Sequence, residues 1–161
     1  MDSRLIPYAA LALLPVAAAL NLTALLRAKK ACGKKEAPLN AKIHPALFLL
    51  IPLSVLLIAA CFFRDFSLGG SFAVCGCGIL GFYLSLREFC FRAAAGIYEN
   101  GCILSPGFFL FRDAEEAESP EDGVLAVTTK TREKKMFQIH NAGRAKILAA
   151  LREKNPRAQI R

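Results

Sequence analysis

The sequence lacks the short motifs that mark common catalytic sites. It contains no G-x-S-x-G nucleophile elbow, no H-E-x-x-H zinc motif and no glycine loop of the phosphate-binding type. The acidic residues Asp113, Glu115, Glu116 and Glu118 do not have the spacing of an EF-hand loop, so ordinary solvated charges explain them better than a cation site. We therefore predict a chain that is not an enzyme, with no catalytic residue, no metal and no cofactor.

Cysteine is present, but it lacks the arrangement of a zinc site. Cys75 and Cys77 have no second pair of ligands elsewhere in the sequence. Positions 75 and 77 would also lie about 200° apart around a helix and face away from each other. A ridge of small residues at every fourth position explains this segment better, because such ridges let membrane helices pack closely. The predicted helix-packing residues are Gly69, Ala73, Cys77, Gly81 and Ser85.

Charged residues are scarce in the first half of the chain. Residues 1–86 contain eight Lys or Arg and three Asp or Glu, whereas residues 87–161 contain thirteen and ten. Most of the net charge of +8 therefore lies in the apolar half, between two hydrophobic segments. This distribution indicates a membrane-embedded region followed by a polar domain, and it disfavours nucleic acid as the partner of the basic residues.

Three apolar segments without charge are long enough to cross a bilayer. They comprise residues 5–26, 45–63 and 66–86, with a two-residue turn between the second and the third. At 1.5 Å per residue each segment can span a hydrocarbon core of about 30 Å. The N-terminal MDSR lacks the strong positive charge of a signal peptide, so a retained first helix is favoured, and a cleaved one stays the alternative.

The charges that flank these segments predict the orientation of the chain. The loop 27–44 is strongly basic, and the positive-inside rule places it in the cytoplasm. The N-terminus then lies outside the cell membrane, and residues 87–161 lie in the cytoplasm after a connector at 87–95. The basic residues are also candidate contacts with an anionic inner leaflet, although topology determination alone explains them. These candidates are Arg27, Lys29, Lys30, Lys34, Lys35, Lys42, Arg87 and Arg92.

The second half of the sequence has the turn signals and alternation of a small β-sheet. Asn100-Gly101 is a strong hairpin signal and predicts strands at 96–99 and 102–105, with Tyr98 opposite Ile103. Pro106-Gly107 predicts the next turn, before a third strand at 108–111. The acidic segment 112–119 fits either a short helix or a strand.

The remaining segments predict two further strands and a closing helix. A turn at 119–123 precedes a β-branched strand at 124–129, and a charged turn at 130–135 leads to a strand at 136–139. Asn141 can cap an amphipathic helix that ends near Lys154. Its apolar stripe consists of Ile147, Leu148 and Leu151.

The run GIYENGCILSPGFFLFRDAEEAE resembles the start of a pleckstrin-homology-like domain. That domain stands at the C-terminus of uncharacterised bacterial integral membrane proteins. The matching hairpin residues are Gly96, Ile97, Gly101 and Ile103, Phe111 stands where these proteins often have Trp, and Asp113 leads the next segment. Ala114 and Ala117 depart from the family pattern, which has larger apolar residues there. The resemblance covers roughly residues 96–155 and the helices before them, and it implies a fold and a membrane location but no activity.

The combined pattern predicts three transmembrane helices followed by an α+β domain at 96–157, with a short tail at 158–161. The predicted domain is a small antiparallel sheet closed by a C-terminal amphipathic helix. We expect a non-enzymatic, membrane-anchored module that serves protein interaction or scaffolding, with a protein partner or a second copy of the chain as its ligand. The alternative is an accessory or regulatory subunit of a membrane transport or envelope complex that is held mainly through its helices.

Overall fold

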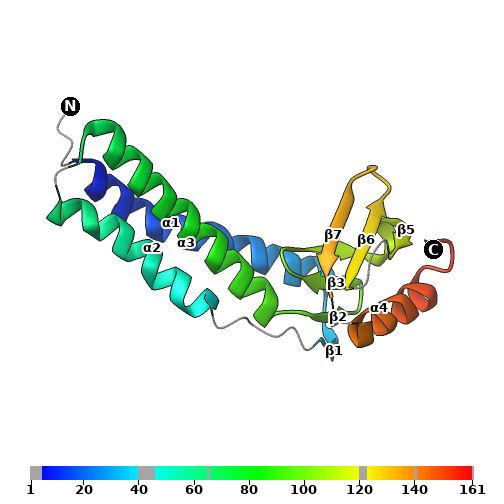
Figure 1. The fold of residues 1–161 in the computed structure, drawn as a ribbon. Helices are drawn as coiled ribbons and strands as arrows, with labels where there is room; N and C mark the ends of the chain where they lie inside the picture. The colour runs from blue at the N-terminus through cyan, green and yellow to red at the C-terminus, as the bar shows by residue number, and fades with distance from the viewer. Residues whose placement is uncertain (1–4, 40–45, 65, 120–122, 140, 161) are drawn as a thin grey trace. The chain divides into compact units, whose positions relative to one another are not determined.

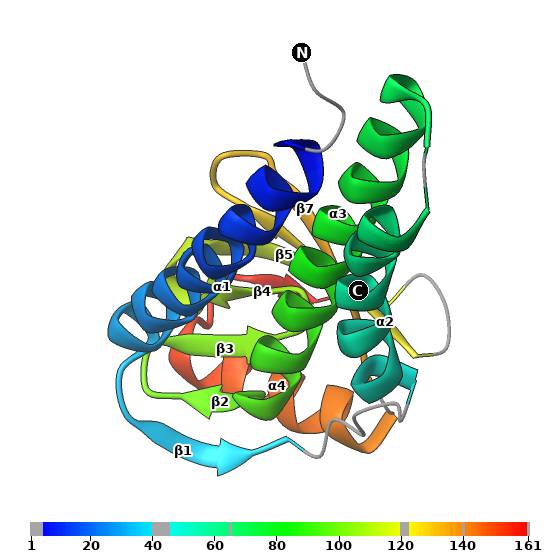
Figure 2. The ribbon, with the colours of Figure 1, turned by 90° about the vertical axis from the view of Figure 1, so that its left-hand side faces the viewer.

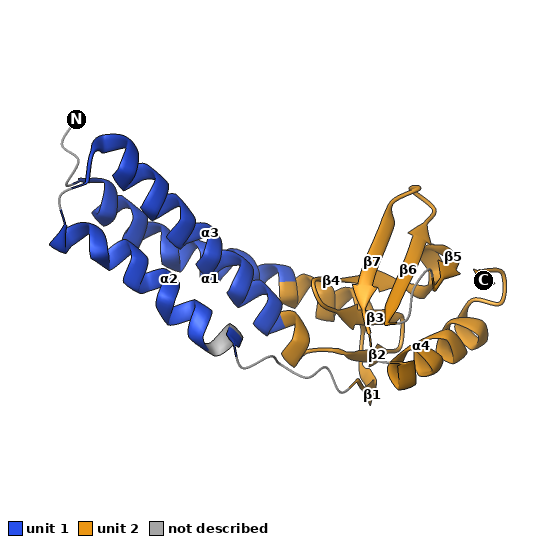
Figure 3. Ribbon diagram, in the orientation of Figure 1, with its two compact units in different colours: residues 1–24, 43–90 blue, residues 25–42, 91–161 orange. Residues whose placement is uncertain are grey.

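A computed structural model describes residues 5–39, 46–64, 66–119, 123–139 and 141–160. The chain divides into two compact units (Figure 3). The helical unit comprises residues 1–24 and 43–90, and the β unit comprises residues 25–42 and 91–161. In chain order the elements are α1 (Leu5–Cys32), β1 (Lys35–Pro38), α2 (Ala46–Phe63), α3 (Leu68–Ala93), β2 (Gly96–Tyr98), β3 (Gly101–Leu104), β4 (Gly107–Leu110), the 3-10 helix η1 (Phe111–Asp113), β5 (Ala114–Glu118), β6 (Val124–Thr129), β7 (Lys134–Gln138), α4 (Asn141–Lys154) and β8 (Gln159–Ile160) (Figure 1).

Helices α1, α2 and α3 form the helical unit around a narrow apolar contact. Ile6 and Ala10 of α1 pack with Ile58 of α2 and Cys75 of α3. Large apolar side chains elsewhere on the helices are exposed, as Leu56 at 63% and Leu80 at 61% show. Such a surface is costly in water and favourable in hydrocarbon. Among the described residues, α1 and α3 are long and apolar enough to cross a membrane, and α2 has a shorter apolar stretch, Leu49–Phe63.

The helices extend beyond the bounds that the sequence predicted. The first predicted segment, 5–26, belongs to a helix that runs to Cys32, and the predicted connector 87–95 is helical to Ala93. The interval 27–44 is therefore not a loop throughout, because α1 continues into it and β1 follows. Charged residues limit the apolar stretch that can span a lipid bilayer, but they do not end the helix. Lys, Arg and Glu are good helix formers, so the helix continues past them.

Two four-stranded sheets and α4 make up the β unit. The first sheet has the order β1-β2-β3-β4, whose strands lie side by side in Figure 2, and the second has the order β7-β6-β5-β8. Phe109, Leu125 and Phe137 from the strands meet Ile147 and Leu151 of α4 in one buried cluster. The helix and β6 occupy the predicted residues, and burial of each large apolar side chain stabilises the unit by about 1.5–3 kcal/mol.

The first hairpin differs from the predicted register by two residues. Ile97 pairs with Cys102 and Gly96 pairs with Ile103, so the turn lies at Glu99-Asn100 instead of Asn100-Gly101. The reason is a contact beyond the hairpin, because the Asn100 N–H donates to the Cys32 carbonyl (2.9 Å) at the end of α1. A shift of two residues keeps every side chain on its predicted face of the sheet.

The sequence of segment 112–119 fitted either a short helix or a strand. In the structure it belongs to η1 and then to β5. Ala114 and Ala117 face the core and are buried, and Ala158 and Ile160 pack against the same cluster. The predicted turn at 119–123 lies partly outside the described residues, but Gly123 has the positive φ of +85° that a turn glycine adopts. Strands β1 and β8 are additions that the sequence did not predict.

Candidate interaction surfaces

The predicted basic residues lie mostly at the end of α1 and along β1. Five of them are exposed, namely Arg27, Lys29, Lys30, Lys34 and Lys35. Arg87 and Arg92 on α3 are half-buried, and Lys42 lies outside the described residues. Lys29 and Lys30 occupy the last turn of α1, where a positive charge is also favourable next to the helix C-terminus. Lys29 and Lys30 therefore have a favourable position at the end of α1, in addition to the predicted contact with anionic lipid.

Residues of the predicted small-residue ridge differ in how far they are buried within the chain. Gly69, Ala73 and Cys77 are exposed, Gly81 is half-buried and Ser85 is buried. Steps of four residues rotate by about 40° around a helix of 3.6 residues per turn, so the ridge winds from one side of α3 to another. Contact of its exposed part with another helix stays a prediction.

Helix α3 packs against α2 through Gly78 and through Gly81 of the predicted ridge, where an added Cβ would lie 2.8 Å from Ser54 Oγ. A Cβ added at Gly78 would lie 2.6 Å from Cγ1 of Ile58 and 2.9 Å from the Ser54 carbonyl oxygen. Ser71, Cys75 and Gly78 are buried at heptad-like spacings of four and three residues. That spacing was the signal in the sequence that could have identified the packed face.

Polar and sulfur contacts add to the packing of the helical unit. The buried Asn21 side chain of α1 donates to the Ala17 carbonyl and to the Tyr83 carbonyl of α3, both at 3.1 Å. Such a bond between membrane helices is worth about 0.6–2 kcal/mol. Cys75 Sγ lies 3.7 Å from Cys61 Sγ on α2, and Cys77 is exposed, in agreement with the predicted opposite directions of Cys75 and Cys77.

The end of α1 is held within the β unit by the first hairpin. Gly33 follows the helix with φ +82°, and its N–H donates to the Lys29 carbonyl (3.0 Å), which is a common helix-terminating arrangement. The Glu99 carboxylate accepts the Lys34 N–H (3.1 Å), and the Glu99 N–H donates to the Lys34 carbonyl (3.0 Å). The hairpin turn therefore satisfies backbone groups beyond a helix end that would otherwise need water.

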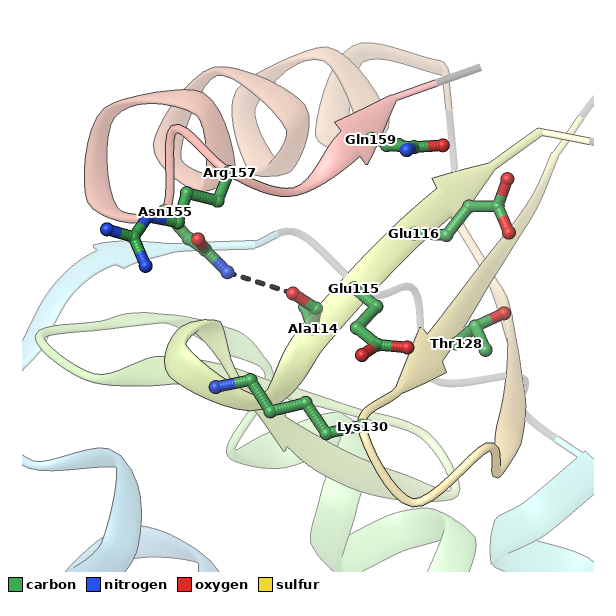
Figure 4. A pocket seen from close by; sticks show the side chains of 8 residues that line it. All are labelled: Ala114, Glu115, Glu116, Thr128, Lys130, Asn155, Arg157 and Gln159. Carbon is green, nitrogen blue, oxygen red and sulfur yellow. Dashed lines mark hydrogen bonds between the residues drawn. The ribbon is translucent and has the colours of Figure 1, made fainter.

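A polar cavity of about 460 Å³ opens on the second sheet of the β unit (Figure 4). Its lining combines carboxylates, amides, a hydroxyl and cations: Ala114, Glu115, Glu116, Thr128, Lys130, Asn155, Arg157 and Gln159. The pairing of β5 with β6 is irregular between Ala114 and Glu116, which leaves Glu115 as the extra residue of a β-bulge. Bulges redirect a side chain from the regular pleat, and here the redirected carboxylate lines the cavity.

The residues after α4 close one side of this cavity. Asn155 donates through Nδ2 to the carbonyls of Phe111 (2.7 Å) and Ala114 (2.8 Å). Beyond it, β8 pairs in parallel with β5, with Gln159 opposite Glu116 and Ile160 opposite Ala117. No periodic signal marks β8 in the sequence, because a two-residue strand is too short to show alternation.

Comparison with family models, curated proteins and solved structures finds no match to this chain.

Proposed function

We propose that the chain is a three-span membrane protein that presents its β unit to a protein partner in the cytoplasm. The pairing of β1 with β2 is the observation that supports the proposed number of membrane crossings. Strand β1 precedes α2 and β2 follows α3, yet Ala37 pairs with Ile97 in one sheet. Strands of one sheet lie on the same side of a membrane, so the chain between them crosses it an even number of times. If the long apolar helix α3 crosses, the shorter α2 crosses as well.

The same pairing links the β unit to the basic segment. Lys34 and Lys35 are joined to the hairpin through backbone contacts with Glu99 and Tyr98, so both belong to the β unit. The positive-inside rule places such a basic segment in the cytoplasm, and the β unit goes with it. Basic side chains near an anionic inner leaflet would each add about 1 kcal/mol of attraction to the membrane.

The strand order supports a pleckstrin-homology-like fold for the β unit. Strands β1 to β4 form one antiparallel sheet, β5 to β7 form the antiparallel part of the second, and α4 follows directly. In this arrangement α2 and α3 are a helical hairpin inserted between the first and second strands. The inserted hairpin is what would attach the domain to the bilayer.

Protein binding is the role that the exposed parts of the β unit favour. Strand β1 is an edge of the first sheet, and its residues Lys35, Glu36 and Pro38 are exposed. Strand β7 is an edge of the second sheet, and its Met136 is 60% exposed. Sheet edges offer unpaired backbone groups to an extended peptide, so they are the surfaces of this unit that best suit a protein ligand.

Site-specific photo-crosslinking of the full chain in cells tests this function. A photoreactive residue replaces Glu36, Met136 or Gln159 in the β unit, or the exposed Leu56 or Leu80 in the helices, and the buried Phe137 serves as the control. We expect a protein adduct of discrete mass from β-unit positions and none from Phe137. Absence of a protein adduct from every β-unit position would overturn the proposal.

The second candidate function is the accessory subunit held through its helices. The exposure of Gly69, Ala73 and Cys77 on one part of α3 favours it, because small residues allow another helix to approach closely. Protein adducts that arise only from the helical positions would support this role instead of the first.

A further inference from the structure

The edge of β5 is covered by a short segment of the same chain. Strand β8 contributes two residues in parallel pairing, whereas β6 pairs with β5 through four residues in antiparallel register. Parallel pairing is slightly less stable per residue than antiparallel pairing. Strand β8 is therefore held more weakly than β6, its counterpart on the other side of β5.

Helix α4 and its C-terminal end are held by contacts other than those of β8. Helix α4 is fixed by the buried Ile147 and Leu151, and Asn155 ties its end to the Phe111 and Ala114 carbonyls. The residues after Asn155 can leave β5 without breaking these contacts. Their release would expose the β5 backbone at Glu116 and Ala117.

Charge and side-chain pattern define what the β5 edge accepts. Three of the five β5 residues are glutamates. Glu118 pairs with Lys134 (3.2 Å), and Glu115 and Glu116 line the cavity together with Lys130. The segment that covers the edge brings Arg157 to the cavity and packs Ile160 against the core, while Gln159 stays exposed. Arg157 lies in a turn, and only Gln159 and Ile160 are extended. A segment that turns at a basic residue and becomes extended before an apolar residue three positions later reproduces these contacts.

We propose that the edge of β5 is a docking site for an extended basic segment of a protein partner, and that β8 covers it when the partner is absent. This inference rests on the protein-binding function proposed above and adds the covered edge of β5 to the exposed edges of β1 and β7. The partner segment would pair with the β5 backbone, place its apolar side chain where Ile160 packs, and direct its cations toward Glu115 and Glu116. The cavity next to Arg157 offers the side chains of the partner segment more room than the chain's own segment fills.

Binding of a synthetic peptide to the purified full-length protein in nanodiscs tests the proposal. The probe is the labelled peptide PRAQIR, which has the sequence of residues 156–161, and the control is a scrambled peptide of the same composition. Three proteins are compared: the intact chain, a chain that ends at Pro156, and the full-length variant Ile160→Asp. The variant releases β8 without shortening the chain, so a folding defect of the truncated protein does not decide the result.

We expect the truncated chain and Ile160→Asp to bind the probe several-fold more tightly than the intact chain. A tethered strand competes at an effective concentration in the millimolar range, which explains the weaker binding of the intact chain. Glu116→Lys in the truncated chain should reduce binding of the probe. The proposal is overturned if neither altered chain binds the probe better than the intact one, or if the scrambled peptide binds equally well.

Two further outcomes concern the identity of the occupant and the location of its binding site. Exchange of tails between intact chains, seen as a dimer, would identify a second copy as the occupant and contradict the partner proposed here. Crosslinks from Glu36 or Met136 together with no binding of the probe would leave the protein-binding function in place and reject the β5 edge as its site.

Discussion

Gly101 lies at a point where the backbone of β4 passes close to β3. Asn-Gly predicts a hairpin, and a hairpin is present, but Gly101 lies inside β3 and its φ is not among the positive values of the described glycines. A Cβ at this position would lie 2.2 Å from the Phe109 carbonyl oxygen. The glycine is needed because the backbone of β4 passes close to it, and a propensity for turns does not contain that information.

Replacing Gly101 with alanine should destabilise the β unit, because backbone atoms of β4 cannot move aside as a flexible side chain can. We expect a loss of about 1–3 kcal/mol, the usual range for an overpacked site. Thermal unfolding of the purified protein measures it. The matched control is Gly107→Ala on the neighbouring strand, where an added Cβ meets nothing within 4 Å and stability should change little. Equal effects of the two substitutions would contradict this explanation.

Burial of Cys102 predicts a loss of stability in alkaline solution. Desolvation raises the pKa of this thiol well above its ordinary value, with a smaller contribution from Cys32. The folded protein therefore keeps the proton while the unfolded chain releases it above about pH 8.5. The stabilisation is complete below that pH and is lost as the pH rises, by at most about 1.4 kcal/mol per pH unit.

Unfolding measurements between pH 8 and pH 10 on the wild type and on Cys102→Ala check this effect. The wild type should lose stability more steeply with rising pH than the variant, whatever the offset between them at pH 8. Parallel pH profiles would show that Cys102 does not titrate differently in the two states.

Strand β1 is one of the two strands that the sequence did not predict. Its residues Lys35–Pro38 are mostly exposed, include a proline and lie in a basic segment that also fits a cytoplasmic loop. An edge strand of this kind is specified by the partner strand that it meets, and β2 lies across two helices in the sequence. The strand matters for any experiment that isolates the domain.

A fragment of residues 90–161 should not reach the stability of the β unit, because it lacks β1 and the end of α1. Ala37 and Leu39 pack against the core cluster, and Ala28 and Cys32 are fully buried. We expect the fragment to unfold at a lower temperature than one in which residues 25–39 are joined to its N-terminus by a flexible linker. Circular dichroism during heating distinguishes the two, and equal midpoints would contradict the assignment of β1.

The packing of α2 on α3 predicts that Gly78 of α3 tolerates no side chain. Gly78→Ala places a methyl group against Ile58 and the Ser54 carbonyl, so we expect looser packing and a lower unfolding temperature in detergent. Gly76→Ala is the matched control two residues away, where an added Cβ meets nothing within 4 Å. A larger effect at Gly76 than at Gly78 would contradict the described contact.

Across the whole molecule, the sequence predicted what depends on local pattern. Hydropathy located the three helices, β-branched residues located β6, and the cap and apolar stripe located α4. The register of the first hairpin, the pairing of β1 and the strand β8 depend on contacts between distant segments, which no local pattern encodes. The cavity shares this origin, since its lining comes from β5, from β6 and the residue after it, and from the segment after α4.

Thiol labelling from outside intact cells tests most directly whether membrane helices hold the β unit in the cytoplasm. Single cysteines replace Ser67, exposed just before α3, and Lys130, exposed in the turn after β6, in a chain without other cysteines. A membrane-impermeant reagent should label position 67 in intact cells and position 130 only after the membrane is opened. Labelling of position 130 in intact cells, or of neither position before lysis, would contradict the proposed topology.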